Sequence, residues 1–343
     1  MSQHDLAASS IPVDLQALHD AVLAARERLR PYIRETPLEE VPASARLTGS
    51  PAGSSAEVLL KLENLQHTCS FKARGALHRL LCLTTDERRG GVVAASSGNH
   101  GAGVAWAASR LGIRAAVYVP EQASPTKIAM IERYGADVHR VGTDGLDTEL
   151  HARAVAEERG ATYVSPYNDL AVMAGQGTIG VELAEQAGAE RGLDAVYVAV
   201  GGGGLIGGIA AYLARALPAA RIIGALPENS PVMERSVRAG TIVDMPSLPT
   251  LSDGTAGGIE PGAVTFPVCQ ALVKEWVLVS EAEIAAAMRR FMEEHHMLVE
   301  GAAGVALAAF ERERARHAGE RVAIVVCGAN IALDRLRAVL REG

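Results

Sequence analysis

The chain has 343 residues, about half of them apolar, and its 33 Lys and Arg face 40 Asp and Glu, for a net charge of -7. This length suggests about two domains with a large core, and the acidic balance excludes the basic surface of a nucleic-acid-binding protein. Four cysteines lie far apart with no C-x-x-C pair, which argues against a zinc site and a disulfide framework and favours a reducing, cytoplasmic setting.

The first residues, MSQHDLAASSIPVD, contain acids and no apolar core, so we expect no secretory signal. Further along, the stretch TCSFKARGA places one lysine, Lys72, directly after Phe71. Burial beside an aromatic ring disfavours the ammonium form and makes a lysine available as an amine and a base. Lys72 is therefore the first candidate for a reactive residue.

Apolar β-rich runs then alternate with segments of helical spacing. The predicted strands are 91–96, 114–120, 137–142, 195–200, 221–226, 275–279 and 321–328. The predicted helices include 98–112, 124–136, 147–161 and 280–295, with Ser124 as an N-cap before Pro125 and a capping box from Ser280 to Glu283. This alternation predicts an α/β fold with parallel sheets flanked by helices. The longest irregular region is 227–267, and such regions often border functional sites.

Residues 195–214, AVYVAVGGGGLIGGIAAYLA, carry no charge and are long enough to be read as a membrane span. Four consecutive glycines would weaken a lone helix in lipid. A buried strand, a glycine turn and a helix explain the segment better.

The glycine run 201–208 of this segment follows a strand and opens a helix, which favours a phosphate site over a mere tight turn. The run also satisfies G-x-G-x-x-G through Gly202, Gly204 and Gly207, with Glu228 at the distance of a ribose-binding acid. A nicotinamide-dependent oxidoreductase is therefore an alternative.

A second loop, SSGNHGAG at 96–103, offers hydroxyls, an amide, an imidazole and backbone donors between a strand and a helix. This composition suits a substrate carboxylate, although a Ser-rich N-cap would explain it without a ligand. A reactive lysine, a phosphate site and a carboxylate site together indicate pyridoxal phosphate (PLP) chemistry on an amino acid.

The motifs ENLQHTCSFKARGA, SSGNHGAG, AGQGTIGVEL, GGGGLIGG, LVEGAAGVALAA and VVCGANIAL occur in this order over residues 21–337. They resemble those of the tryptophan-synthase-β-like PLP enzymes (fold type II), and most closely the serine/threonine dehydratases and serine racemases. The resemblance implies a large cofactor domain (1–88 and 168–343) and a small mobile domain (89–167). It also implies a homodimer or homotetramer with no nucleic-acid or membrane partner.

The resemblance also implies roles for individual residues. Lys72 would be the Schiff-base lysine, and Ser97 the acid or base on the opposite face in racemases. The cofactor would be held by residues from five segments: Phe71, Lys72, Asn99, Gly201, Gly202, Gly203, Gly204, Leu205, Gly254, Glu300 and Cys327. The substrate carboxylate would be held by one loop: Ser96, Ser97, Gly98, Asn99 and His100.

Cys327 ends an apolar run and could be a small core cysteine. In the family this position faces the pyridine nitrogen, which a neutral thiol would not hold protonated, so β-elimination is favoured over transamination. The resemblance thus implies a lyase that converts a 3-hydroxy amino acid such as L-threonine or L-serine to a 2-oxo acid and ammonia. His100 favours dehydratases over the related β-replacement enzymes, which usually carry Thr there.

Several alternatives stay open. A racemase, a dehydratase of another substrate such as hydroxyaspartate or phenylserine, and a catalytically silent ligand-binding descendant all fit the motifs. Metal-binding relatives place acids where Leu226 and Val232 stand in GALPENSPVMERS, so we expect no metal site, with Glu228 and Glu234 out of register. We also expect no regulatory domain after residue 343.

Overall fold

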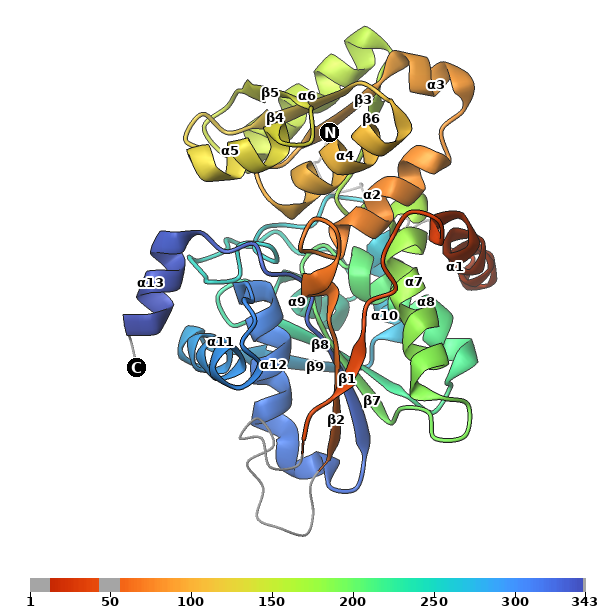
Figure 1. Ribbon diagram of the computed structural model, residues 1–343, viewed down its shortest axis with the longest axis vertical. Coiled ribbons are helices and arrows are strands. Elements are labelled where there is room, and N and C mark those ends of the chain that lie inside the picture. The colour runs from red at the N-terminus through yellow and green to blue at the C-terminus, as the bar shows by residue number, and fades with distance from the viewer. Residues whose placement is uncertain (1–12, 43–55, 342–343) are drawn as a thin grey trace, which may run out of the picture.

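The computed structural model describes residues 13–42 and 56–341 and contains two β-sheets, one above the other in Figure 1. The lower sheet has the order β1-β2-β10-β7-β8-β9. Its strands are β1 Leu38–Glu40, β2 Glu57–Lys61, β7 Ala195–Ala199, β8 Arg221–Pro227, β9 Glu275–Val279 and β10 Arg321–Val325. The upper sheet has the order β5-β4-β3-β6. Its strands are β3 Val92–Ala95, β4 Ala115–Val119, β5 Asp137–Arg140 and β6 Thr162–Tyr163.

All strand pairs are parallel except β1 with β2, which are antiparallel. The predicted α/β fold with parallel sheets is therefore confirmed, and the antiparallel edge strand is an addition to it. β1 has only three residues, two of them exposed, and carries no apolar run that a sequence could reveal.

Helices surround both sheets, as Figure 1 shows. The upper sheet is accompanied by α3 Thr85–Gly90, α4 Asn99–Leu111, α5 Pro125–Glu132 and α6 Gly145–Arg159. The lower sheet is accompanied by α1 Leu15–Leu29, α2 Lys72–Leu81, α7 Leu170–Ala187, α8 Gly204–Ala216, α9 Val232–Ala239, α10 Thr265–Leu272, α11 Glu281–His295, α12 Gly301–Glu313 and α13 Leu333–Arg341. Two short 3-10 turns, Glu63–Leu65 and Arg314–His317, complete the described elements.

The local signals at helix ends were reliable. Ser124 accepts a hydrogen bond from the Lys127 N–H and Pro125 is the first residue of α5. Ser280 and Glu283 form the capping box of α11. Each of these contacts lies within three residues of sequence, so it depends on local chemistry alone.

Two interpretations of long apolar or irregular segments can now be tested. Residues 195–214 form β7 and most of α8, and no helix among the described residues is long and apolar enough to cross a membrane. Region 227–267 is less irregular than expected, because it contains the eight-residue helix α9. The expectation about a secretory signal concerns residues 1–14, nearly all of which lie outside the described part of the chain.

The upper sheet falls between Val92 and Tyr163, within the small domain proposed for residues 89–167. Its core also includes side chains from outside that range, namely Ala73 and Leu77 of α2 and Val172 of α7. Helix α2 lies between the two sheets in Figure 1 and packs against both α4 and α7. Whether the two parts move as separate domains stays a prediction.

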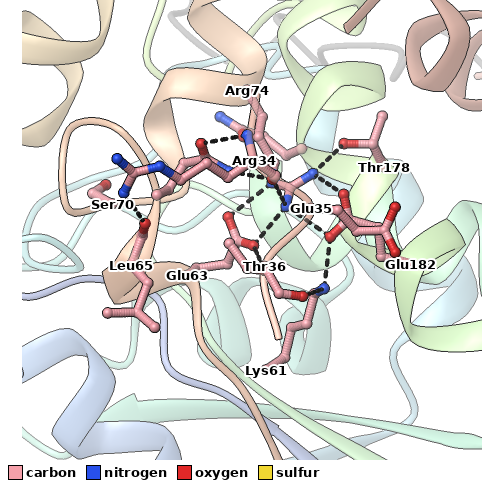
Figure 2. A network of polar contacts seen from close by, with 12 residues as sticks. Arg34, Glu35, Thr36, Lys61, Glu63, Leu65, Ser70, Arg74, Thr178 and Glu182 are labelled. Atoms are coloured by element: carbon pink, nitrogen blue, oxygen red, sulfur yellow. Dashed lines mark hydrogen bonds and ion pairs between the residues drawn. The ribbon is translucent and has the colours of Figure 1, made fainter. Parts of the chain in front are cut away.

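A buried cluster of charged side chains fixes the start of α2 (Figure 2). Arg74 donates to both oxygens of Glu63 and of Glu182, at 2.6–2.9 Å. Lys61 lies 2.6 Å from Glu182, and all four side chains are fully buried. Burial works to raise the pKa of Glu182, but the charges of Arg74 and Lys61 outweigh it and hold that pKa below its usual range. The four fully buried charges thus balance one another, and Arg26 lies at their margin, 3.8 Å from Glu182.

We predict that Glu182→Gln destabilises the protein by about 3–5 kcal/mol, because it leaves a buried positive charge uncompensated. Glu185→Gln is the matched control on the same helix. Glu185 is half-exposed where it pairs with Arg26, so its loss should cost only about 0–1 kcal/mol. Urea denaturation of the parent and the two variants measures how much free energy of unfolding each variant loses. Equal losses for the two variants would mean that water reaches the cluster.

Candidate functional site

One cavity of about 650 Å³ collects side chains from both sheets. It is lined by every residue to which the resemblance assigned a cofactor or substrate role: Phe71, Lys72, Ser96, Ser97, Gly98, Asn99, His100, Gly201, Gly202, Gly203, Gly204, Leu205, Gly254, Glu300 and Cys327. These residues come from segments up to 256 positions apart (71 to 327) that the fold brings together. Their roles toward a ligand remain proposals.

Lys72 is the first residue of α2, and its Nζ points into the region where the two sheets meet. The Nζ donates to the carbonyl of Pro166 at 2.8 Å and lies 5.2 Å from the centre of the Phe71 ring. Burial lowers the pKa of Lys72 to about 8, against the opposing charge of Glu300. The free amine is therefore a minority form at neutral pH, but a far larger one than for an exposed lysine.

The glycine run meets α8 in a geometry that suits an anion. Gly203 is the N-cap of α8 with φ +86°, a left-handed conformation that favours glycine. A Cβ on Gly202 would lie 2.4 Å from the Tyr167 ring. The first intrahelical bond runs from Gly207 N–H to Gly203 O, so the N–H groups of Gly204 and Leu205 precede it and are available to a phosphate.

The loop before α4 has the same character. Gly98 is the N-cap, and no side chain caps this helix. The first intrahelical bond is Ala102 N–H to Gly98 O, which leaves the preceding backbone donors to a ligand. Ser96 Oγ instead accepts from the Gly98 N–H at 3.1 Å and shapes the turn. The alternative of a Ser-rich N-cap does not describe this loop.

His100 is held in the core by one ring nitrogen. Its Nε2 lies 2.7 Å from the carbonyl of Val164, which can only accept, so Nε2 carries the proton. Burial lowers the pKa of His100 to about 3. The imidazole therefore stays neutral, and His100 can bind a carboxylate through its backbone N–H rather than through a charged ring.

Glu300 and Cys327 come from the C-terminal part of the chain and are buried in the same cavity. Burial raises the pKa of Glu300 to about 7, although hydrogen bonds from Asn99 and from the Asn330 N–H lower it. Burial also raises the pKa of the Cys327 thiol well above its usual range. Cys327 is thus a neutral thiol, as its expected place beside a pyridine nitrogen requires.

These features fit the cofactor that the resemblance implies. A buried lysine with a lowered pKa, an open helix N-terminus behind bare glycines and a neutral thiol share one cavity. They match the aldehyde, the phosphate and the ring nitrogen of pyridoxal phosphate.

The residues considered for a metal or a ribose are used differently. Leu226 and Val232 are buried in the hydrophobic core. Glu228 pairs with Arg312 at 3.3 Å, and Glu234 pairs with Arg238 at 2.8 Å. The part of the chain that the structure describes contains no group of three His, Cys, Asp or Glu residues arranged to hold a metal.

Sequence reasoning missed two parts of the cavity. Asn330 lies three residues after Cys327 and hydrogen-bonds Asn99. Lys127 of α5 pairs with Asp253 at 3.2 Å and joins the two parts of the cavity wall. The position of Asn330 just after a strand, at the sheet edge where Cys327 lies, could have revealed it. Nothing local predicts the ion pair.

The chain is similar to known proteins over most of its length. Residues 29–328 match the family model described as pyridoxal-phosphate dependent enzyme. L-threonine ammonia-lyase of Geobacter sulfurreducens is 38% identical over 319 residues, which cover 93% of this chain and 77% of that protein.

Two solved structures share the fold across almost the whole chain. Processed threonine deaminase isoform 2 of Solanum lycopersicum has a TM-score of 0.88 and 32% identity, covering 95% of this chain and 92% of that one. Maize serine racemase has a TM-score of 0.85 and 31% identity, covering 94% and 97%. The chain therefore belongs to the family of pyridoxal-phosphate dependent enzymes.

The lowered pKa of Lys72 predicts a pH-dependent stability. In the cofactor-free protein the buried ammonium costs free energy below pH 8, and this cost disappears as the pH rises from about 8 toward the ordinary value of 10.5. Lys72→Met should therefore stabilise the protein at pH 7 by roughly 1–3 kcal/mol, with a gain that shrinks above pH 8. Denaturant unfolding at several pH values measures it.

Lys274→Met is the control, because Lys274 is exposed and donates only to the carbonyl of Gln270. Its effect on the free energy of unfolding should stay small and nearly constant with pH. A Lys72→Met protein that is less stable than the parent at pH 7 would contradict the burial of a strained ammonium.

Proposed function

We propose that this enzyme is a lyase that converts a 3-hydroxy amino acid such as L-threonine or L-serine to a 2-oxo acid and ammonia. The observation that carries the proposal is the buried amine of Lys72 with its pKa lowered to about 8, in one cavity with two open helix N-termini. The name of the Geobacter sulfurreducens relative, an L-threonine ammonia-lyase, supports the same reaction.

The cofactor would be held at both ends by this chain. The backbone N–H groups at residues 201–205 would bind the phosphate, and Lys72 would attach covalently. Phe71, Asn99, Gly254, Glu300 and Cys327 would surround the ring. When bound, pyridoxal phosphate withdraws electrons from the α-carbon of the amino acid.

Residues of the chain supply the binding and the proton transfer. The backbone N–H groups of Ser97, Asn99 and His100 would bind the substrate carboxylate at the N-terminus of α4 and so orient the α-hydrogen, because the N–H groups of Ser96 and Gly98 donate to Tyr118 O and Ser96 Oγ. Lys72 Nζ, whose pKa burial lowers to about 8, would accept the α-proton in its amine form. The β-hydroxyl would take that proton from Lys72 and leave as water. The enamine would be released as Lys72 reattaches, rearrange to an imine and add one water molecule to give the 2-oxo acid and ammonia.

Cys327 would direct the cofactor to elimination. Its thiol is fully buried and its pKa is raised well above the usual range, so it stays uncharged. An uncharged thiol does not hold a ring nitrogen protonated as an aspartate would. Weaker electron withdrawal shortens the life of a carbanion, which favours prompt loss of the hydroxyl over transamination.

The oxidoreductase alternative loses its main support. Glu228 would have to bind a ribose, but it is half-exposed, pairs with Arg312 and is not among the residues that line the cavity. The glycine run instead shares the cavity with Lys72.

Racemisation of an amino acid is the second candidate function. Ser97 lines the same cavity as Lys72 and could act on the opposite face of the α-carbon. The likeness to maize serine racemase supports this alternative.

Three finer properties complete the proposal. A cytoplasmic location is supported by the free state of Cys69, Cys82, Cys269 and Cys327. A homodimer or homotetramer is carried over from the resemblance alone. A small neutral substrate side chain is supported by the pairing of Lys127 with Asp253, which neutralises a cation of the cavity wall.

We predict that the purified protein with pyridoxal phosphate absorbs visible light and releases equal amounts of 2-oxo acid and ammonia from L-threonine or L-serine. No added nucleophile should be needed. Lys72→Ala should abolish both the covalent attachment of the cofactor and turnover. Product that forms only with an added thiol would indicate β-replacement instead. Chiral chromatography of the remaining serine tests the racemase alternative, which requires D-serine to accumulate.

We also propose that activity needs no divalent cation. A hard cation requires several oxygen ligands together, whereas Leu226 and Val232 are buried and apolar and both neighbouring glutamates pair with arginines. Treatment with a strong chelator should leave turnover and melting temperature unchanged. Recovery of both with magnesium or calcium, in a saturable manner, would reveal a site with other ligands.

A further inference from the structure

The side-chain amide of Asn99 is held by the protein at both of its polar atoms. Its Nδ2 lies 2.8 Å from Oε1 and 2.9 Å from Oε2 of Glu300. Its Oδ1 accepts a hydrogen bond from Nδ2 of Asn330 at 2.6 Å. An amide nitrogen can only donate, so once Asn330 is oriented, the end of Asn99 that meets Nδ2 of Asn330 must be its oxygen.

The orientation of Asn330 is determined independently. Its Nδ2 also donates to the backbone carbonyl of Thr68 at 2.8 Å, and a carbonyl oxygen can only accept. A reversed Asn330 amide would place its oxygen against two other oxygens. The backbone N–H of Asn330 donates to Glu300 at 3.1 Å. Asn330 therefore contacts both Asn99 and Glu300, which also contact each other.

This chain of hydrogen bonds joins four separate segments at the cavity. Thr68 lies four residues before Lys72, Asn99 is the first residue of α4, Glu300 is the N-cap of α12, and Asn330 follows β10. Thr68 is only 3% and Glu300 7% exposed. Asn99 and Asn330 are half-buried at the cavity wall, so the buried groups that would lose a partner are the Thr68 carbonyl and the Glu300 carboxyl.

We propose that Asn330 and Glu300 are positioning residues that hold Asn99 so that its amide nitrogen, and not its carbonyl oxygen, faces the cofactor, with one N–H on Glu300 and the second N–H left to donate to the cofactor. The proposal rests on the proposed function in taking pyridoxal phosphate as the ligand. Because Oδ1 of Asn99 is occupied by Asn330, Asn99 can only act as a donor toward an oxygen of the ring. A reversed Asn99 would place its oxygen against the oxygens of Glu300 and its nitrogen against Nδ2 of Asn330.

The decisive variant is Asn330→Asp, which keeps the shape of the side chain. It removes both N–H donors and places an acceptor against Thr68 O and Asn99 Oδ1. The dissociation constant of pyridoxal phosphate should rise about 10- to 100-fold, the effect of leaving one or two buried polar groups unpaired. The visible absorption maximum of the bound cofactor should also shift. Both are measured by titrating the cofactor-free protein without substrate.

Asn229→Asp is the matched control. The Asn229 Nδ2 also donates to a backbone carbonyl, that of Pro249, but Asn229 does not line the cavity. The Asn229→Asp protein should have the same dissociation constant for pyridoxal phosphate and the same absorption spectrum as the parent. Asn330→Ala, which removes the donor without adding an opposed acceptor, should weaken cofactor binding less than Asn330→Asp. It serves as the second variant if the aspartate protein fails to fold.

A double-mutant cycle distinguishes positioning from a general structural role. If Asn330 acts through Asn99, Asn330→Asp should weaken cofactor binding much less in an Asn99→Ala protein than in the parent. Glu300→Gln should retain more affinity than Glu300→Ala, because a glutamine oxygen can still accept from Asn99. Equal effects of Asn330→Asp with and without Asn99, or an unchanged dissociation constant and spectrum, would overturn the proposal. Failure of the parent protein to bind the cofactor would instead refute the proposed function.

Discussion

The position of Lys72 depends on the buried ion cluster around Arg74, two residues further along α2. A guanidinium keeps its charge at every pH that a protein survives, so its burial requires anions within hydrogen-bond reach. Glu63 follows β2 and Glu182 lies on α7, so the two carboxylates tie α2 to a strand of the lower sheet and to the helix beside it (Figure 2). The amine of Lys72 is thereby held where the two sheets meet.

Burial acts on four titratable groups of the cavity. It lowers the pKa of Lys72 and His100 and raises that of Glu300 and Cys327. All four groups are driven toward their neutral forms. The negative charges of a bound phosphate and carboxylate would then meet helix N-termini, whose partial charges do not titrate. Such a site separates binding, carried by backbone dipoles, from proton transfer, carried by Lys72.

The sequence allowed the local and the repeated features to be predicted. Ser124, Ser280 and Gly112 mark helix ends through contacts within a few residues, and the alternation of strands and helices leads directly to parallel sheets. Neither the partnership of Lys61 with Glu182, 121 positions apart, nor the edge strand β1 leaves a local pattern. Such features depend on which elements the fold makes neighbours, and only three-dimensional packing decides that.

Asn330 shows how far a motif can extend beyond the residues to which it assigns a role. The stretch after β10 drew attention for Cys327, yet the hydrogen bonds that orient Asn99 come from three residues later. An amide has one donor end and one acceptor end of nearly equal shape, so packing alone cannot select its orientation. Selection requires a neighbour whose role as donor or acceptor is fixed. Thr68 O can only accept, so it holds Asn330 with its nitrogen as the donor, and that nitrogen in turn selects the oxygen end of Asn99. The directionality therefore originates in a backbone carbonyl, the one partner here that neither ionises nor rotates.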